Sequence, residues 1–222
     1  MKLALKELRR RPGRFATATV ILTLIAILLM FLGGLLDGLI ASSTGAIRAQ
    51  NADAIVYSDT AQASFLRSRI DPELRAQVEA VDGVTEVGGI GNVQLGARVP
   101  GNGPRDLASV ALFGYELAPD GVPDAPPYGQ AWADESIKAD NVEEGMIIEI
   151  GPARTPIEII GFVADTNFNG QSSLWASPDT WRDTLSANRP DAQLGPDVFQ
   201  ALIVRGDGDA LPDAIDAATA GA

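Results

Sequence analysis

The segment FATATVILTLIAILLMFLGGLL, from Phe15 to Leu36, decides how the rest of the chain is organised. It contains no charged residue and is mostly apolar over its 22 residues. A helix of this length extends about 33 Å, which is enough to cross the hydrocarbon core of a bilayer, about 30 Å thick. Only a helix satisfies its own backbone hydrogen bonds in lipid. We therefore predict a transmembrane helix over residues 15–40.

The charges that flank this segment predict its orientation. The basic residues before it are Lys2, Lys6, Arg9, Arg10, Arg11 and Arg14, and a single acid, Glu7, stands among them. After the segment the next basic residue is Arg48. By the positive-inside rule, residues 1–14 lie in the cytoplasm, and residues 1–11 are expected to form a short amphipathic helix at the membrane surface. The chain beyond the span is expected to be extracytoplasmic.

A cleaved signal peptide is the alternative to a membrane anchor, because both begin with basic residues followed by an apolar run. Ala41-Ser42-Ser43 could serve as the cleavage site. The apolar region of a signal peptide is about 7–15 residues long, which is shorter than the run here. The length favours an uncleaved anchor of the cell membrane.

Two glycines near the outer end of the predicted span have a spacing that favours close helix packing. Gly34 and Gly38 form a small-xxx-small pair, which could let a neighbouring helix approach. Asp37 lies between them and places the pair at the membrane interface. We expect the helix to continue beyond the membrane as a stalk, at residues 41–52.

Composition excludes several classes of function. The chain has 17 basic and 29 acidic residues, and because residues 1–14 carry a net charge of +5, the remainder carries −17. Such a domain repels nucleic acid. The chain has neither cysteine nor histidine, so it has no disulfides, no usual zinc site, no cysteine nucleophile and no Ser-His-Asp triad. We therefore predict no catalytic residue, no metal site and no cofactor, and a protein that is not an enzyme.

The pattern beyond the stalk predicts an α+β domain over residues 53–222. A strand at 53–58, a helix that opens at Asp71-Pro72 and a strand at 84–93 form one β-α-β unit. A strand at 199–204 and a helix at 211–220 repeat the first half of that unit. Because the closing strand of this repeat is missing, we expect the sequence to be a fragment of a longer polypeptide.

The residues between the two halves, 93–198, are expected to form an inserted β-rich lobe. Strands are predicted at 107–115 and, as an antiparallel hairpin, at 146–150 and 156–163. Ser177-Pro178 has the signature of a helix start, with serine as N-cap and proline in the first turn.

Three motifs are candidate sites. Asp165–Gly170 (DTNFNG) matches the first half of a calcium loop, but its twelfth position is Ala176 where a bidentate glutamate is needed, so a polar turn is preferred. The glycines at 88, 89 and 91 fail the phosphate-binding spacing at Gln94, and a closely packed strand is preferred. Ser136 and Lys138 would suit a Ser-Lys hydrolase only if the lysine were desolvated beside the serine.

The whole chain resembles the first part of FtsX-like/MacB-like ABC transporter permeases. The resemblance rests on the basic leader KELRRRPGR and the span that follows it. It continues in the segments ADAIVYS, VEAVDGVTEV, VALFGYE, EEGMIIEIG, TPIEIIGFV, LWASPDTW and FQALIVRGDGDAL. In that family a core domain made of paired β-α-β units with an inserted lobe lies outside the membrane, between the first and second of four spans.

The resemblance implies a non-catalytic permease subunit that works as a homodimer or permease pair with a separate cytoplasmic ABC ATPase. Such a subunit transmits ATP-driven motion to its extracytoplasmic domain, for export or release of a substrate. The alternative of a different class is a single-span, membrane-anchored module that binds an extracellular ligand or protein.

Overall fold

The computed structural model describes residues 12–62, 64–192, 194–208 and 210–219. The chain divides into two compact units, Met1–Ala41 and Ser42–Ala222. We refer to the second unit as the sheet domain. The predicted amphipathic helix at residues 1–11 lies outside the described residues.

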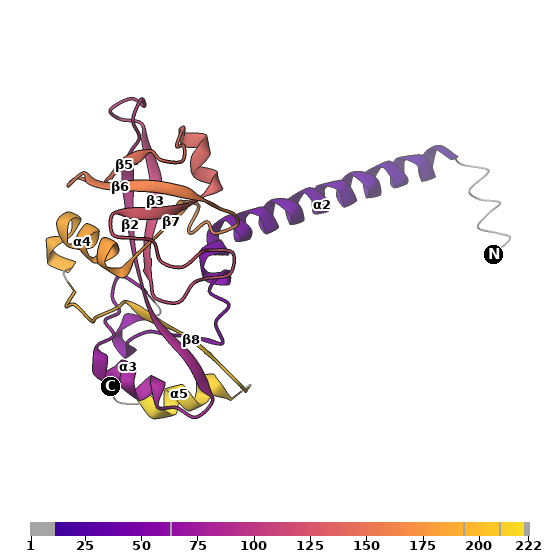
Figure 1. Cartoon of the computed structure of the whole chain (residues 1–222). Coiled ribbons are helices and arrows are strands. Elements are labelled where there is room, and N and C mark those ends of the chain that lie inside the picture. Colours follow the sequence, from indigo (N-terminus) through magenta and orange to yellow (C-terminus); the bar gives the residue numbers. More distant parts are fainter. Residues whose placement is uncertain (1–11, 63, 193, 209, 220–222) are drawn as a thin grey trace. The chain divides into compact units, whose positions relative to one another are not determined.

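The first unit consists of most of α2 (Pro12–Arg48), a single 37-residue helix whose last residues belong to the sheet domain (Figure 1). Residues Ala16–Ile40 are long and apolar enough to cross a membrane. Their large apolar side chains are exposed, with Met30 78% and Phe31 68% accessible. A helix that is apolar all round and exposed in water would be unstable, so this composition suits lipid. The helix continues beyond residue 40 as far as Arg48.

Within the described residues, the sheet domain has eight strands in one continuous sheet. They are β1 (Ala54–Val56), β2 (Val84–Arg98), β3 (Leu107–Tyr115), β4 (Gln130–Asp134), β5 (Ile147–Ile150), β6 (Thr155–Val163), β7 (Ser172–Ala176) and β8 (Ala201–Gly206). Their order is β1-β8-β2-β3-β7-β4-β6-β5, and β5 also pairs with β2. The helices are α2, α3 (Pro72–Glu79), α4 (Pro178–Asn188) and α5 (Leu211–Thr219), with short 3₁₀ turns η1 (Asp59–Ala61), η2 (Glu135–Asp140) and η3 (Pro190–Ala192).

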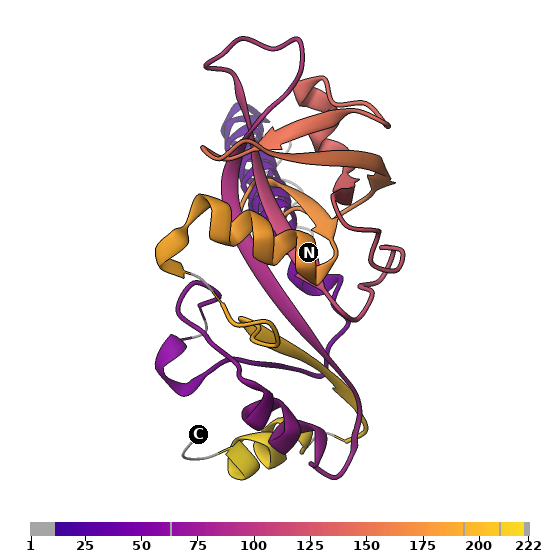
Figure 2. The same cartoon turned by 60° about the vertical axis from the view of Figure 1, so that its left-hand side comes forward.

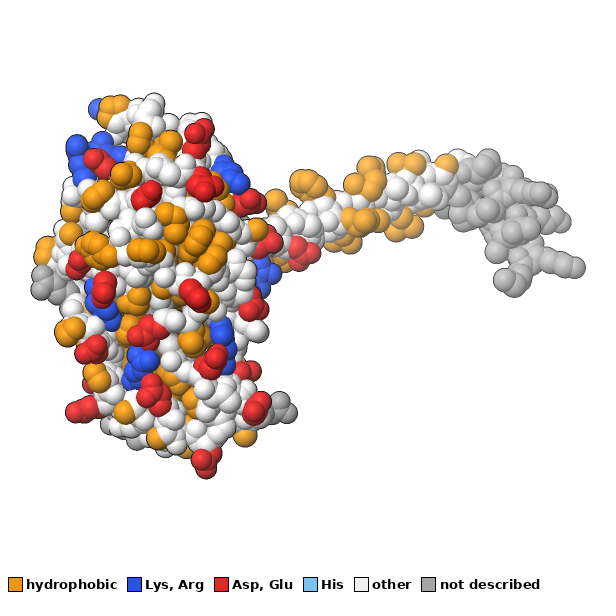
Figure 3. Space-filling model, viewed as in Figure 1, with side chains coloured by type: hydrophobic (Ala, Val, Ile, Leu, Met, Phe, Trp, Pro, Cys, Tyr) orange, Lys and Arg blue, Asp and Glu red, His pale blue; other side chains and the backbone are white. Residues whose placement is uncertain are grey.

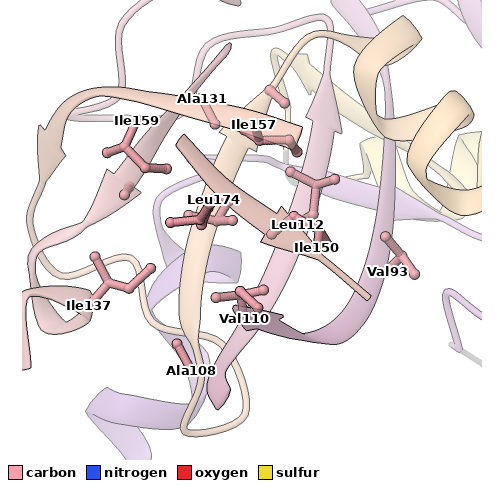
Figure 4. Packing of buried hydrophobic residues seen from close by; sticks show 14 of the residues in the cluster. Val93, Ala108, Val110, Leu112, Ala131, Ile137, Ile150, Ile157, Ile159 and Leu174 are labelled. Carbon is pink, nitrogen blue, oxygen red and sulfur yellow. The ribbon is translucent and has the colours of Figure 1, made fainter. Parts of the chain in front are cut away.

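The pairing of β5 with β2 closes the strands β2-β3-β7-β4-β6-β5 into a small barrel. Ala97 pairs with Ile150, and Arg98 pairs with Glu149. Figure 4 shows the apolar side chains of these strands pointing toward one another in the interior. Nine of the labelled residues belong to these strands: Val93, Ala108, Val110, Leu112, Ala131, Ile150, Ile157, Ile159 and Leu174. The tenth, Ile137, comes from η2. A barrel of this size is filled by side chains and leaves no channel.

The other lobe is built from β1, β8 and the first half of β2, with α3 and α5. Strand β8 pairs antiparallel with both β1 and β2, so it lies between the two strands of the predicted β-α-β unit. Asp71 caps α3 as predicted, accepting a hydrogen bond from the N–H of Leu74 at 2.9 Å. Figure 2 shows β2 running through both lobes. The predicted fold class, a β-α-β lobe with an inserted β-rich lobe, is confirmed.

Helix α4 explains why position 91 in the glycine run of β2 is glycine, while the neighbouring Gly88 and Gly89 lie against Leu117 and Phe199. Gly91 pairs with Gly114 across β2 and β3, and the indole of Trp181 in α4 lies against both. A Cβ on Gly114 would lie 2.5 Å from the Cβ of Trp181, and a Cβ on Gly91 would overlap the indole ring. These positions therefore exclude any side chain, and the predicted closely packed strand is confirmed.

Candidate functional site at the C-terminal end of α2

The end of α2 is built into the sheet domain, and we call residues 42–50 the stalk end. Ala46 and Gln50 are fully buried in it. Gly45 has no room for a side chain, because an added Cβ would lie 2.5 Å from the carbonyl oxygen of Asp165 and 2.9 Å from the amide nitrogen of Asn167. Glycine here permits two backbone segments to approach closely.

The loop at residues 165–170 holds the stalk end through backbone hydrogen bonds. The N–H of Ala46 donates to the carbonyl of Asn167 at 3.0 Å. In the opposite direction, the N–H groups of Asn169 and Gly170 donate to the carbonyls of Ser43 and Ser42, each at 3.1 Å. Three main-chain bonds in both directions fix the rotation and the axial position of this helix end relative to the loop.

The shape of this loop requires the residues that looked like a calcium motif. Asp165, Asn169 and Gly170 have φ of +58°, +51° and +72°, the left-handed region that aspartate, asparagine and glycine tolerate best. The Asn167 side chain accepts a hydrogen bond from Ser136 Oγ at 2.9 Å. No cluster of three His, Cys, Asp or Glu able to hold a metal occurs in the described part of the chain. The structure matches the preferred interpretation, a polar turn.

A buried carboxylate fastens the loop to the barrel. Asp134, at the end of β4, is 1% exposed. Its Oδ1 accepts from the N–H of Ser136 at 2.9 Å, and its Oδ2 accepts from the N–H and Oγ1 of Thr166 at 2.8 and 2.9 Å. Ser173 Oγ in β7 lies 2.7 Å from Thr166 Oγ1. Several hydrogen bonds to one carboxylate offset the cost of burying it.

An aromatic cluster fills the space beneath the loop and the stalk end. Phe168, from the loop, meets Phe113 edge-on with ring centroids 5.3 Å apart, and Phe65 at 6.3 Å. Phe113 in turn stacks on Trp175 at 4.7 Å. Ala46 belongs to the same buried cluster. Edge-on and stacked pairs add about 0.5–1.5 kcal/mol each beyond burial, so this cluster stabilises the packing of the stalk end against the sheet domain.

The last carbonyls of the stalk end also have partners. The carbonyl of Ala49 accepts from the N–H of Asp120 at 2.6 Å. Arg205 Nη2, from β8, donates to the carbonyl of Gln50 at 3.2 Å and to that of Ala118 at 2.9 Å. Arg205 Nη1 forms an ion pair with Glu86 of β2 at 3.1 Å. A guanidinium at a helix C-terminus is favoured by the helix dipole, and here it ties that terminus to two strands.

None of the site residues predicted from the sequence belongs to the stalk end. Lys2, Lys6, Arg9, Arg10 and Arg11 fall outside the described residues, and Arg14 lies in the first turns of α2. Gly34 and Gly38 lie within α2 with nothing inside 4 Å of an added Cβ. Their roles in topology and helix contact stay predictions.

Ser136 and Lys138 do not form a catalytic pair. Ser136 Oγ lies 2.7 Å from Ser172 Oγ and also bonds the side chain of Asn167. Lys138 forms an ion pair with Glu135 at 2.9 Å and lies over the ring of Phe162 at 4.3 Å. An exposed lysine in an ion pair is not desolvated as a Ser-Lys hydrolase requires.

Gly45 and Asp134 were missed by sequence reasoning as functional residues. Gly45 is one of 23 glycines, and its importance comes from a contact with residue 165. The one usable signal was the polar turn at 165–170, whose left-handed residues indicate a specific backbone shape. Nothing in the sequence indicates that the loop at 165–170 contacts the end of α2.

Comparison with known proteins gives matches among solved structures. No family model matches the chain, and the comparison with curated proteins gives no match. The periplasmic region of MacB from Actinobacillus actinomycetemcomitans is similar, with a TM-score of 0.45 and 12% identity over 67% of this chain and 73% of that one. The extracellular domain of the noncanonic ABC-type transporter YknZ from Gram-positive bacteria is similar with a TM-score of 0.43 and 17% identity, over 72% of this chain and 86% of that one.

Proposed function

We propose that this chain is the N-terminal part of a non-catalytic ABC transporter permease subunit, in which α2 spans the membrane and the sheet domain lies on the extracytoplasmic side. The apolar, exposed segment Ala16–Ile40 supports membrane insertion. The six basic residues before it support a cytoplasmic N-terminus. The net charge of −17 on the remainder keeps the sheet domain off anionic lipid headgroups.

The observation that carries the proposal is the continuity of α2 into the stalk end. One helix, Pro12–Arg48, contains both the apolar segment and the residues held by the loop at 165–170. A hydrogen-bonded helix is stiff along its axis. Its last turns here form backbone hydrogen bonds with the domain, approach the loop closely at Gly45 and pack on the aromatic cluster. The stalk end is therefore fastened to the barrel, and in this proposal it is the point at which motion of the membrane helix reaches the sheet domain.

The proposed source of that motion is a cytoplasmic ABC ATPase, with the permease acting as a homodimer or permease pair. Nucleotide chemistry would reside in the ATPase, because the chain has no phosphate-binding glycine loop. The role of the sheet domain is then mechanical, in export or release of a substrate outside the membrane.

Cross-linking in the source membranes tests this proposal. After cross-linking, the protein is isolated with an antibody against residues 53–200, and co-isolated proteins are identified by mass spectrometry. Recovery of an ABC ATPase, absent when the antibody is first saturated with purified residues 53–200, is expected. A protein isolated without any ATP-binding partner would favour the single-span binding module.

The orientation in the membrane is tested separately by cysteine labelling. This labelling is specific because the chain has no native cysteine. A membrane-impermeant maleimide should label a Ser109→Cys variant on intact cells, and an Ala4→Cys variant only after the cells are permeabilised. Labelling of the Ala4→Cys variant on intact cells would overturn the orientation.

A further inference from the structure

A tight hairpin turn of the sheet domain lies beside the first residues of the stalk end, and we call residues 168–171 the hairpin turn. The N–H of Phe168 donates to the carbonyl of Gln171 at 3.0 Å, and the N–H of Gln171 donates to the carbonyl of Phe168 at 2.9 Å. Between them, Asn169 and Gly170 have φ of +51° and +72°, as in the two-residue turns of type I′ that close β-hairpins. Both of these tip residues are exposed.

The tip of the hairpin turn is bonded to the helix within two residues of the apolar segment. The N–H of Gly170 donates to the carbonyl of Ser42 at 3.1 Å, and the apolar segment ends at Ile40. Two residues rise about 3 Å in a helix and reach about 7 Å when fully extended. This limit holds at any angle between the apolar segment and the sheet domain, because it depends only on the length of chain between them. The tip therefore lies next to the end of the apolar segment.

The headgroup layer of a bilayer occupies the same region. It is about 5–8 Å deep on each side of the hydrocarbon core. With Ala16–Ile40 in the core, as proposed above, the tip lies in this layer or at its outer surface. Only Ala41 separates the apolar segment from the first residue that is bonded to the hairpin turn. No long linker therefore holds the turn away from the lipids.

The hairpin turn is uncharged, although the domain that carries it is acidic. From residue 42 onward the sequence has 11 Lys and Arg against 27 Asp and Glu, and Figure 3 shows acidic side chains over much of the visible face of the domain. The sequence of residues 168–171 is Phe-Asn-Gly-Gln. An uncharged tip is not repelled by lipid phosphates, and the side-chain amide of Asn169 can donate hydrogen bonds to them.

The charged groups around the hairpin turn leave a small negative excess. Asp165 is exposed in the same loop, and Glu135 and Lys138 of the neighbouring η2 form an ion pair at 2.9 Å. At the end of α2, Arg48 and Asp120 are both exposed. The remaining carboxylates nearby are the buried Asp134 and, before the stalk end, Asp37. Such surroundings disfavour anionic headgroups and suit zwitterionic ones, whose ammonium groups offset the carboxylates.

We propose that the hairpin turn lies in the headgroup layer of zwitterionic phospholipids, so that the sheet domain rests directly on the extracytoplasmic surface of the membrane. This inference rests on the proposed insertion of α2 into the bilayer. It adds a second contact with the membrane, made by a part of the chain that is about 130 residues distant from the span in sequence.

Paramagnetic broadening of nuclear magnetic resonance signals tests the proposal without any substitution. The isotopically labelled full chain is placed in phosphatidylcholine nanodiscs in which a small share of the lipid carries a nitroxide, either on its headgroup or in the middle of its acyl chain. A nitroxide broadens the backbone amide signals of nearby residues. We expect the headgroup nitroxide to broaden the signals of Asn169 and Gly170 strongly.

Helix α4 supplies the internal control, because it lies on the other face of β2 and β3. Gly114 of β3 contacts Trp181 of α4, whereas the preceding Phe113 belongs to the buried cluster that contains Ala46 of the stalk end. Successive residues of a strand point to opposite faces of a sheet. The amide signals of α4 should therefore be broadened much less than those of the tip. Equal broadening of the tip and α4 by the headgroup nitroxide would overturn the proposal.

The acyl-chain nitroxide separates a failure of this inference from a failure of the proposed membrane insertion. It should broaden the amide signal of Met30, in the middle of the apolar segment, whatever the position of the hairpin turn. Absence of that effect would overturn the insertion of α2. Broadening at Met30 without broadening at Asn169 and Gly170 by the headgroup nitroxide would overturn the headgroup contact alone.

A last comparison tests the chemistry of the lipid. In nanodiscs that also contain anionic phosphatidylglycerol, broadening of the tip signals by the headgroup nitroxide should be no stronger than in phosphatidylcholine alone. A contact that appears only with phosphatidylglycerol would show electrostatic attraction, through a cation such as Arg48, and would overturn the assignment to zwitterionic headgroups.

Discussion

Gly45 in the stalk end and Asp165 in the loop approach so closely that a Cβ on residue 45 would lie 2.5 Å from the carbonyl oxygen of Asp165. We predict that a Gly45→Ala variant forces the loop and the helix end apart. Overpacking of this kind costs about 1–3 kcal/mol of unfolding free energy. Denaturant unfolding of the full chain in detergent, followed by tryptophan fluorescence, measures the loss.

The control for this change is Gly103→Ala, because an added Cβ there meets only the Cβ of Asp106 at 3.9 Å. Its unfolding free energy should stay within about 0.5 kcal/mol of the unchanged protein. Equal stability of the Gly45→Ala and Gly103→Ala variants would contradict the close packing of Gly45 against the loop at 165–170.

The carboxylate of Asp134 should be essential to the loop that holds the stalk end. An Asp134→Ala variant leaves the part-buried N–H of Ser136 and the buried N–H of Thr166 without their acceptor, and the loss at Thr166 alone costs about 1–3 kcal/mol. Hydrogen–deuterium exchange should show faster exchange in residues 165–170 than in the unchanged protein. An Asp106→Ala variant, at an exposed acid, should exchange normally, and an unchanged rate in the Asp134→Ala variant would refute the role of this carboxylate.

Trp181 and Gly91 are predicted to be energetically coupled. A Gly91→Ala variant overlaps the indole and should destabilise the protein by about 1–3 kcal/mol. A Trp181→Leu variant leaves a cavity and is also destabilising. In the double variant the new methyl group occupies part of that cavity, so the combined cost should be smaller than the sum of the two. Strict additivity of the unfolding free energies would show that the two residues are not in contact.

The Tyr115 phenol should make the unfolding free energy depend on pH in the alkaline range. Burial raises the pKa of the Tyr115 phenol, as does the nearby Asp124 carboxylate, and the hydroxyl donates to the carbonyl of Pro123 at 2.6 Å. Above pH of about 10 the unfolded chain loses a phenol proton that the folded chain keeps, so the unfolding free energy falls as the pH rises. A Tyr115→Phe variant should be less stable at pH 7 by about 1 kcal/mol, through the lost hydrogen bond.

The decisive comparison for Tyr115 is the slope of unfolding free energy against pH above pH 10. That slope should be shallower in the Tyr115→Phe variant than in the unchanged protein. Identical slopes would show that this phenol ionises equally in the folded and unfolded states.

The features predicted correctly from the sequence have local causes. The strand at 107–115, the β5–β6 hairpin and the helices that open at Pro72 and Pro178 follow from alternation, turns and caps within a few residues of each element. The apolar segment of α2 was equally clear, because an uncharged, mostly apolar run of 22 residues has the length and composition of a membrane-spanning helix.

The features that were missed depend on distant contacts. Strands β4 and β7 are five residues each and contain glutamine or serine, so no periodic pattern marks them; they are strands because both neighbours pair with them. Closure of the barrel rests on two residue pairs between β2 and β5. The packing of the stalk end depends on a contact between Gly45 and a loop about 120 residues further along the chain.

One measurement tests most directly whether the stalk end moves as a single body with the rest of the sheet domain. Spin labels are attached to an Arg48→Cys/Ser109→Cys variant of the full chain in lipid nanodiscs, and their separation is measured by pulsed electron paramagnetic resonance. We predict one narrow distance distribution, which broadens when Gly45→Val is added. A broad or multiple distribution without that substitution would show a flexible joint at residues 42–50 and would contradict mechanical coupling through α2.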